Sequence, residues 1–85
     1  MVEMEYEEER ALEDGTVGIY TWKAVFNDEE AAIAQAGQDI AEGRNPVRVK
    51  EHGEEAQRRG ATAPRMLINT EDLRRRAREH GQSIF

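Results

Sequence analysis

Cysteine is absent from this sequence of 85 residues, so disulfides and thiolate-bound zinc are excluded. Uninterrupted apolar runs are also short. None approaches the roughly 20 residues that a membrane-spanning helix needs, and the first residues lack the basic start and apolar stretch of a secretion signal. We therefore expect a protein of the cytoplasm that has no membrane partner.

Large apolar residues are scarce as well. Leu, Ile, Val and Phe together supply 15 of the 85 residues, which is below the fraction of about 20% at which a highly charged composition begins to indicate disorder. The net charge is only −6 and the apolar residues are grouped into segments, so we expect one folded domain over residues 1–85. A core this lean is one physical motive for a homodimer, because a partner surface can complete the burial.

Side chains suited to catalysis are few. The only serine is Ser83, and the only imidazoles, His52 and His80, lie in polar stretches rich in Arg and Glu. Metal sites need three or four converging ligands, and acid–base catalysis needs a desolvated carboxyl group rather than a solvated run such as residues 7–9. We expect no enzyme, no metal site and no cofactor.

The first half of the sequence predicts a β-hairpin. Val2, Met4 and Tyr6 alternate with carboxylates inside an acidic segment, residues 1–14, as in a strand with one solvated face. A helical turn over residues 8–12 is an alternative reading of its end. Asp14-Gly15 is typical of a turn. Residues 17–26 form the strongest strand signal, apolar on both faces, which favours an interior strand or a strand with one face at an interface.

A helix should follow, opened by Asn27 or Asp28, with Glu30 completing a capping box with Asn27. Gly43 and Pro46 should end it. Mid-helix Gly37 indicates close approach to a sheet or to a second helix. The residues expected to face inward are Ile33, Ala36, Gly37 and Ile40.

The second half predicts two short strands and a helix. Residues 47–50 should form a strand with Val47 and Val49 inward, parallel to the strand before the helix. Residues 51–64 read as a polar loop with one helical turn near residues 54–58, and residues 65–68 as a last strand. An Arg-rich helix should span residues 70–80. The predicted fold is α+β, a mixed three- to four-stranded sheet in the order ββαββα with helices on one face.

Charge divides the chain unevenly. Residues 1–57 carry 15 acidic and 5 basic side chains, whereas residues 58–85 carry 7 arginines and 3 acids. Each half is either a solvated surface or a binding surface. The acidic half could meet a basic protein partner, and the basic half could meet nucleic acid. The acidic candidates are Glu3, Glu5, Glu7, Glu8 and Glu9, and the basic candidates are Arg65, Arg74, Arg75, Arg76 and Arg78.

The favoured hypothesis is a non-enzymatic regulatory or inhibitory protein whose carboxylates occlude a basic, nucleic-acid-binding partner. Tyr20 and Trp22 are candidate interface aromatics, although a lone Trp in a strand is more often a core residue. The alternative is a dimeric nucleic-acid-binding regulator using the helix over residues 70–80. The segments 43–47 and 67–73 resemble Phd/YefM-type antitoxins in scattered residues. The chain departs from that pattern in its longer helix and in the position of its basic residues.

Overall fold

Alternating side chains build the first strand, β1 (Val2–Ala11), as the sequence predicts. Val2, Met4 and Tyr6 are buried, and the strand continues to Ala11 where a helical turn was the alternative. The turn that follows holds Gly15 at φ +85°, a left-handed conformation that favours glycine. The second strand, β2 (Val17–Phe26), returns antiparallel to β1 and completes the hairpin.

The computed structural model describes residues 1–82, which contain a four-stranded sheet in the order β2-β1-β3-β4. β3 (Pro46–Glu51) and β4 (Met66–Ile68) complete the sheet, and neighbouring strands all pair antiparallel. The expected parallel pairing of β2 with β3 was wrong, because β1 lies between them and pairs with both. β2 is consequently an edge strand, so the first of the two expectations for it, an interior strand, was wrong.

The first helix, α1 (Glu29–Ala41), begins at Asp28, whose Oδ1 accepts a hydrogen bond from the N–H of Ala31 at 2.8 Å. The capping residue is therefore Asp28 rather than Asn27. The expected inward stripe was partly wrong, because Ile40 is 44% exposed while Ala32, Ala36 and Asp39 are buried. The rotation follows from packing against a second helix. A side chain added at Gly37 would stand 3.4 Å from the backbone oxygen of Ala77.

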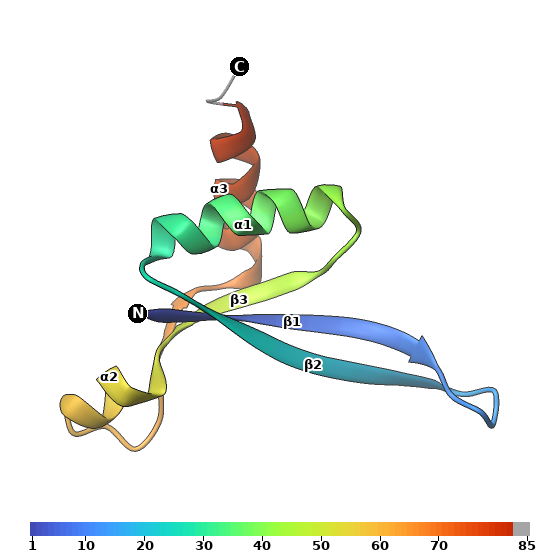
Figure 1. Ribbon diagram of the computed structural model, residues 1–85, viewed down its shortest axis with the longest axis horizontal. Helices are drawn as coiled ribbons and strands as arrows, with labels where there is room; N and C mark the ends of the chain where they lie inside the picture. Colours follow the sequence, from blue (N-terminus) through green and yellow to red (C-terminus); the bar gives the residue numbers. More distant parts are fainter. Residues whose placement is uncertain (83–85) are drawn as a thin grey trace.

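Two further helices complete the chain. The expected polar loop contains a short helix, α2 (Gly53–Arg58), and the Arg-rich segment forms α3 (Thr70–Gln82), where Asn69 Oδ1 accepts from the N–H of Asp72 at 2.9 Å. The two longer helices, α1 and α3, cover the same face of the sheet (Figure 1). The α+β class and the order of strands and longer helices are thus confirmed. None of the helices within residues 1–82 is long and apolar enough to span a membrane.

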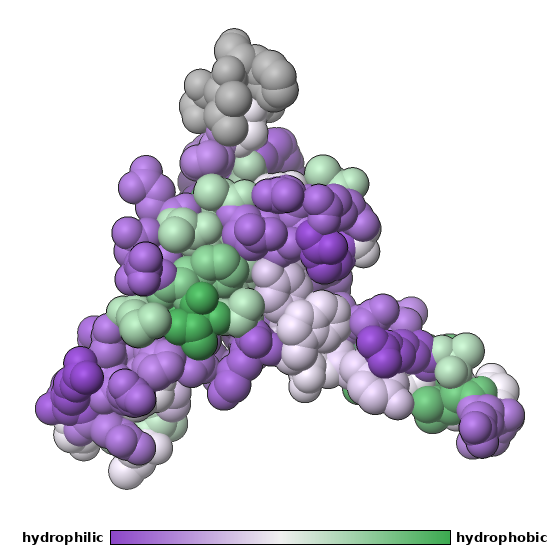
Figure 2. Space-filling view, in the orientation of Figure 1, coloured by the Kyte–Doolittle hydropathy of each residue, from purple (hydrophilic) through white to green (hydrophobic). Residues whose placement is uncertain are grey.

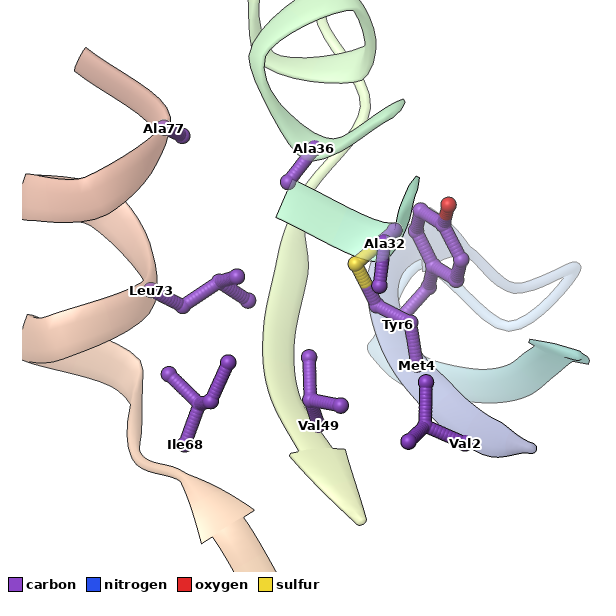
Figure 3. Close-up of a cluster of buried hydrophobic side chains, with 9 residues drawn as sticks. All are labelled: Val2, Met4, Tyr6, Ala32, Ala36, Val49, Ile68, Leu73 and Ala77. Atoms are coloured by element: carbon purple, nitrogen blue, oxygen red, sulfur yellow. The ribbon is translucent and has the colours of Figure 1, made fainter. Parts of the chain in front are cut away.

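The hydrophobic core lies between that face and the two helices (Figure 3). Leu73 and Ala77 reach it from α3, and Val49 and Ile68 reach it from β3 and β4. From β1, only the residues up to Tyr6 contribute. The core therefore anchors the half of the β1–β2 hairpin that holds Val2, Met4 and Tyr6. The other half of the hairpin, which ends in the turn at Gly15, extends beyond the helices (Figure 1). The buried members of this cluster are Val2, Met4, Tyr6, Ala32, Ala36, Val49, Ile68, Leu73 and Ala77.

Candidate functional site

The outer half of the hairpin, residues 7–21, is here called the arm. β3 pairs with β1 only between Val2 and Tyr6, and one further contact follows, in which the Glu7 N–H donates to the Asn45 carbonyl at 3.1 Å. Beyond that contact β1 pairs with β2 alone. The second edge of β1 is therefore open along the arm, in line with the end of β3.

A notch lies beside this open edge, between the arm and the α1–β3 connection. It encloses about 620 Å³. Carboxylates from β1 meet there with apolar surface from β2, and the backbone of the connection closes the far side. Figure 2 shows apolar residues among hydrophilic ones along the arm. The notch is lined by Glu7, Glu8, Glu9, Ile19, Trp22, Gly43, Arg44 and Asn45.

The charge of the notch is negative because its cation is already engaged. Arg44 Nε donates to Asp39 Oδ1 at 2.8 Å, and Arg44 also pairs with Glu42. Glu8 is paired with the neighbouring Arg10 at 3.1 Å, in an exposed contact that contributes little free energy. Within residues 1–82, no ion pair involves Glu9. The side chain of Glu9 is therefore the carboxylate most available to a cation from outside.

Trp22 forms the aromatic wall of the notch. Its ring stacks on that of Tyr6, with centroids 5.1 Å apart and planes inclined by 2°. The Tyr6 hydroxyl in turn donates to Asp39. The indole remains 38% exposed although it is fixed from behind. Trp22 is thus neither a core residue nor a freely rotating surface residue. Tyr20, the other expected interface aromatic, lies further along the arm beneath the guanidinium of Arg10, 4.7 Å from its ring centre.

A buried carboxylate, Asp39, supports the notch and escaped sequence analysis. It accepts hydrogen bonds from Tyr6, from Gln35 Nε2 at 2.9 Å and from Arg44. Burial raises the pKa of Asp39, but these donors outweigh it and hold the pKa below the ordinary 3.8. Burial, followed by the bond to Asp39, raises the pKa of Tyr6. The network ties β1, α1 and the α1–β3 connection together behind Trp22.

The other two acidic candidates lie away from the notch. Glu3 and Glu5 are on the sheet face opposite α1 and α3, where Lys23 approaches Glu3 at 3.5 Å and Lys50 approaches Glu5 at 3.3 Å. Arg48 also pairs with Glu5. Burial raises the pKa of Glu5, but the bonds from Arg48 and Lys50 lower it below the ordinary 4.5. Glu3 and Glu5 are therefore neutralised within the fold.

The five basic candidates do not form one surface. Three of them are paired with separate acids, namely Arg65 with Glu51 at 3.4 Å, Arg75 with Asp72 at 3.1 Å and Arg76 with Glu29 at 3.9 Å. Arg74 Nη2 donates to Asn45 Oδ1 at 3.2 Å. Arg74 and Arg78 do share a groove between α1 and α3, which encloses about 400 Å³. Its other lining residues are Gly37, Ile40, Arg44, Asn45 and Ala77.

The two histidines lie outside the notch. His52 caps α2, where its Nδ1 accepts from the N–H of Glu54 at 3.3 Å, and its Nε2 lies 3.8 Å from Glu3. His80 lies in the last turn of α3. Within residues 1–82, no three His, Cys, Asp or Glu side chains converge as metal ligands. Ser83 lies outside the described residues.

The chain matches no family model, no curated protein and no solved structure.

Proposed function

We propose that this chain is a non-enzymatic binding protein whose acidic notch receives an extended, basic segment of a partner protein. The observation that carries the proposal is the coincidence of an open strand edge, a carboxylate of Glu9 that has no ion pair within residues 1–82, and a fixed, part-exposed indole at one place. Such a segment would continue the line of β3 and add a strand to β1, where main-chain hydrogen bonds supply affinity and side chains supply specificity.

The chemistry of the partner follows from the lining of the notch. Lys or Arg side chains would meet Glu8 and Glu9, and an apolar or aromatic side chain would pack on Trp22. A partner with this pattern commonly uses its cations on phosphates, so occupation of the notch would occlude a nucleic-acid-binding surface. The protein would then act as an acidic inhibitor.

Trp22 provides the test, because it is the only tryptophan in the chain and it lines the notch. We would titrate the protein with synthetic peptides in which Arg alternates with Val or Leu, and follow the indole emission. We expect saturable binding that weakens as salt is added, because charge pairs are screened. A Glu8→Gln/Glu9→Gln double variant should bind about tenfold more weakly, if each charge contributes roughly 0.7 kcal/mol.

The matched control is a Glu30→Gln/Glu54→Gln variant, which removes the same charge from exposed positions on α1 and α2. It should bind the peptides as the unaltered protein does. An equal loss in both variants would mean that only net charge matters, and the notch would then not be the site. Unchanged Trp22 emission with every basic peptide would also contradict the proposal.

A second candidate function rests on the groove between α1 and α3. Arg74 and Arg78 both line it, and neither has an ion pair within residues 1–82. Their guanidinium groups suit phosphate oxygens. In this alternative the protein contacts nucleic acid through α3 as a dimer, because two copies double the number of phosphate contacts. Binding to duplex DNA that is lost in an Arg74→Ala/Arg78→Ala variant, but kept in Arg75→Ala/Arg76→Ala, would favour it over the notch.

A further inference from the structure

The outer edge of β2 is open along its whole length. β2 is the first strand of the sheet and has β1 as its only neighbour within residues 1–82. It contains no proline, and its register with β1 runs from Phe26 to Val17 without a shift. Proteins usually protect such an edge with proline, with a bulge or with charge. On β2 the only charged residue is Lys23.

Exposed apolar side chains concentrate on the same strand. Val17 and Ile19 are 64% and 66% exposed, and Val25, Tyr20 and Trp22 are also among the large exposed apolar residues. Of these residues, Val17, Ile19 and Tyr20 lie in the arm, which extends beyond the helices (Figure 1). A two-stranded ribbon of this kind is marginally stable in water without a third strand or a packed face. A further strand along this edge would therefore cover exposed apolar side chains and stabilise the arm.

The backbone groups that face outward on β2 can be identified. At the end of the hairpin the Leu12 N–H donates to the Thr16 carbonyl, which places the even-numbered residues of β2 in hydrogen bonds to β1. Antiparallel ladders alternate, so the odd-numbered residues turn their N–H and C=O groups away from β1. Thr21 is the odd-numbered residue nearest the middle of the strand.

We infer that the β2 edge binds a second copy of this chain, with the two β2 strands antiparallel about a two-fold axis at Thr21. In this register Thr21 faces Thr21 of the second copy, Val17 faces Val25, and Tyr20 faces Trp22. Apolar, β-branched and aromatic pairs of this kind are the ones that stabilise sheets. An axis at Lys23 would instead oppose two ammonium groups, and an axis at Trp22 would place Tyr20 against Ala24.

Charge also fits this register. Lys23 faces Ile19 of the second copy, and Ile19 is paired across its own hairpin with Glu9. In the single chain Lys23 lies 3.5 Å from Glu3, and Glu9 has no ion pair within residues 1–82. Strands lie about 4.8 Å apart, so in the dimer the exposed Lys23 side chain can leave Glu3 and extend over Ile19 toward Glu9 of the second copy. The dimer is thus a single sheet of eight strands with its own interchain charge contact.

Cross-linking tests this register directly, because the natural chain has no cysteine. In a Thr21→Cys variant the two sulfurs meet across the axis, where paired Cα atoms lie about 5.5 Å apart, within the range of a disulfide. We expect mild oxidation to join its chains at least tenfold faster than those of Thr62→Cys, which places a cysteine at an exposed position off the sheet.

A mixture provides the matched control. Val17→Cys and Val25→Cys should each cross-link slowly alone and rapidly when mixed, because these two positions face each other only between copies. Added salt should speed cross-linking, because both copies carry −6, whereas it should weaken peptide binding at the notch. The failure of one proposal is therefore distinguishable from the failure of the other.

Two results would overturn the inference. One is a Thr21→Cys variant that cross-links no faster than Thr62→Cys. The other is a Val17→Cys variant that cross-links alone as fast as it does when mixed with Val25→Cys.

Discussion

The inner and outer halves of the β1–β2 hairpin share two strands and one register, yet they have different surroundings. In the inner half Val2, Met4 and Tyr6 lie beneath α1 and α3 and are almost fully buried. In the outer half the arm has no helix above it, and the open edge of β1 carries carboxylates. The inner half of the hairpin therefore contributes to the stability of the fold. On our proposals the other half serves binding.

The largest predicted effect is on the free energy of unfolding, when a buried core residue and an exposed residue of the arm are each replaced by Ala. Leu73 is fully buried and Ile19 is exposed, and each loses a similar side chain on substitution by Ala. Leu73→Ala should lower the free energy of unfolding by about 2–5 kcal/mol, whereas Ile19→Ala should change it by less than about 0.5 kcal/mol. Urea denaturation of dilute protein measures both. Equal losses would mean that the arm is part of the core.

The buried carboxylate behind Trp22 should give the next largest effect. Asp39→Asn keeps the size of the side chain but weakens the hydrogen bonds from Tyr6 and Arg44. We expect a loss of about 1–3 kcal/mol in the free energy of unfolding. Glu9→Gln, which alters an exposed carboxylate of the arm, is the control and should be nearly neutral. If Asp39→Asn were neutral as well, the network would not be what holds Trp22 in place.

The pH dependence of stability should have the same origin. The pKa of Asp39 is lowered in the folded protein, so its contribution is present above the ordinary value of 3.8 and is lost as the pH falls through the folded value. The free energy of unfolding should therefore decrease on acidification below about pH 4, and the decrease should be smaller in Asp39→Asn. An identical acid profile in the two proteins would show that other carboxylates dominate.

The smallest predicted effects on stability come from replacing two glycines, one in the arm and one beside α1, by alanine. Gly15 in the arm and Gly43 beside α1 have φ angles of +85° and +88°, and a Cβ at either meets no atom within 4 Å. Alanine at each position should therefore cost only the left-handed backbone, about 1–2 kcal/mol. Gly43→Ala should lower global stability by that amount. Gly15→Ala should instead fray the arm, with faster amide exchange near the turn and little change in the urea midpoint.

The sequence predicts local features well. The alternation in β1, the Asp14-Gly15 turn, the start of α1 at Asp28, its end before Gly43 and the close approach at Gly37 all depend on neighbouring residues, and the structure has each of them, although the expected capping box of Asn27 and Glu30 is replaced by a cap at Asp28. The order in which strands pair in the sheet is harder to predict from the sequence. Nothing local to β2 says that β1 will pair with β3 on its other side, so an apolar strand that reads as interior lies at an edge.

The candidate site divides in the same way. Charge patterning indicated the carboxylates of β1, but Glu3 and Glu5 lie beside the cations of β2 and β3, whereas Glu7, Glu8 and Glu9 line the notch. Asp39 escaped sequence analysis because its partners come from other elements. The sequence did contain one signal for the burial of Asp39. It lies on α1 three residues after the buried Ala36, and residues three apart share one face of a helix.

Amide hydrogen exchange in dilute protein tests the central claim most directly, since it reports the stability of each half of one hairpin separately. The account predicts that the amides of Leu12 and Tyr20 exchange at least about 100-fold faster than those of Met4 and Ala24 when the chain is monomeric. Protection in the arm should rise as protein or a basic peptide is added. Equal protection of the two halves in the dilute monomer would contradict the account.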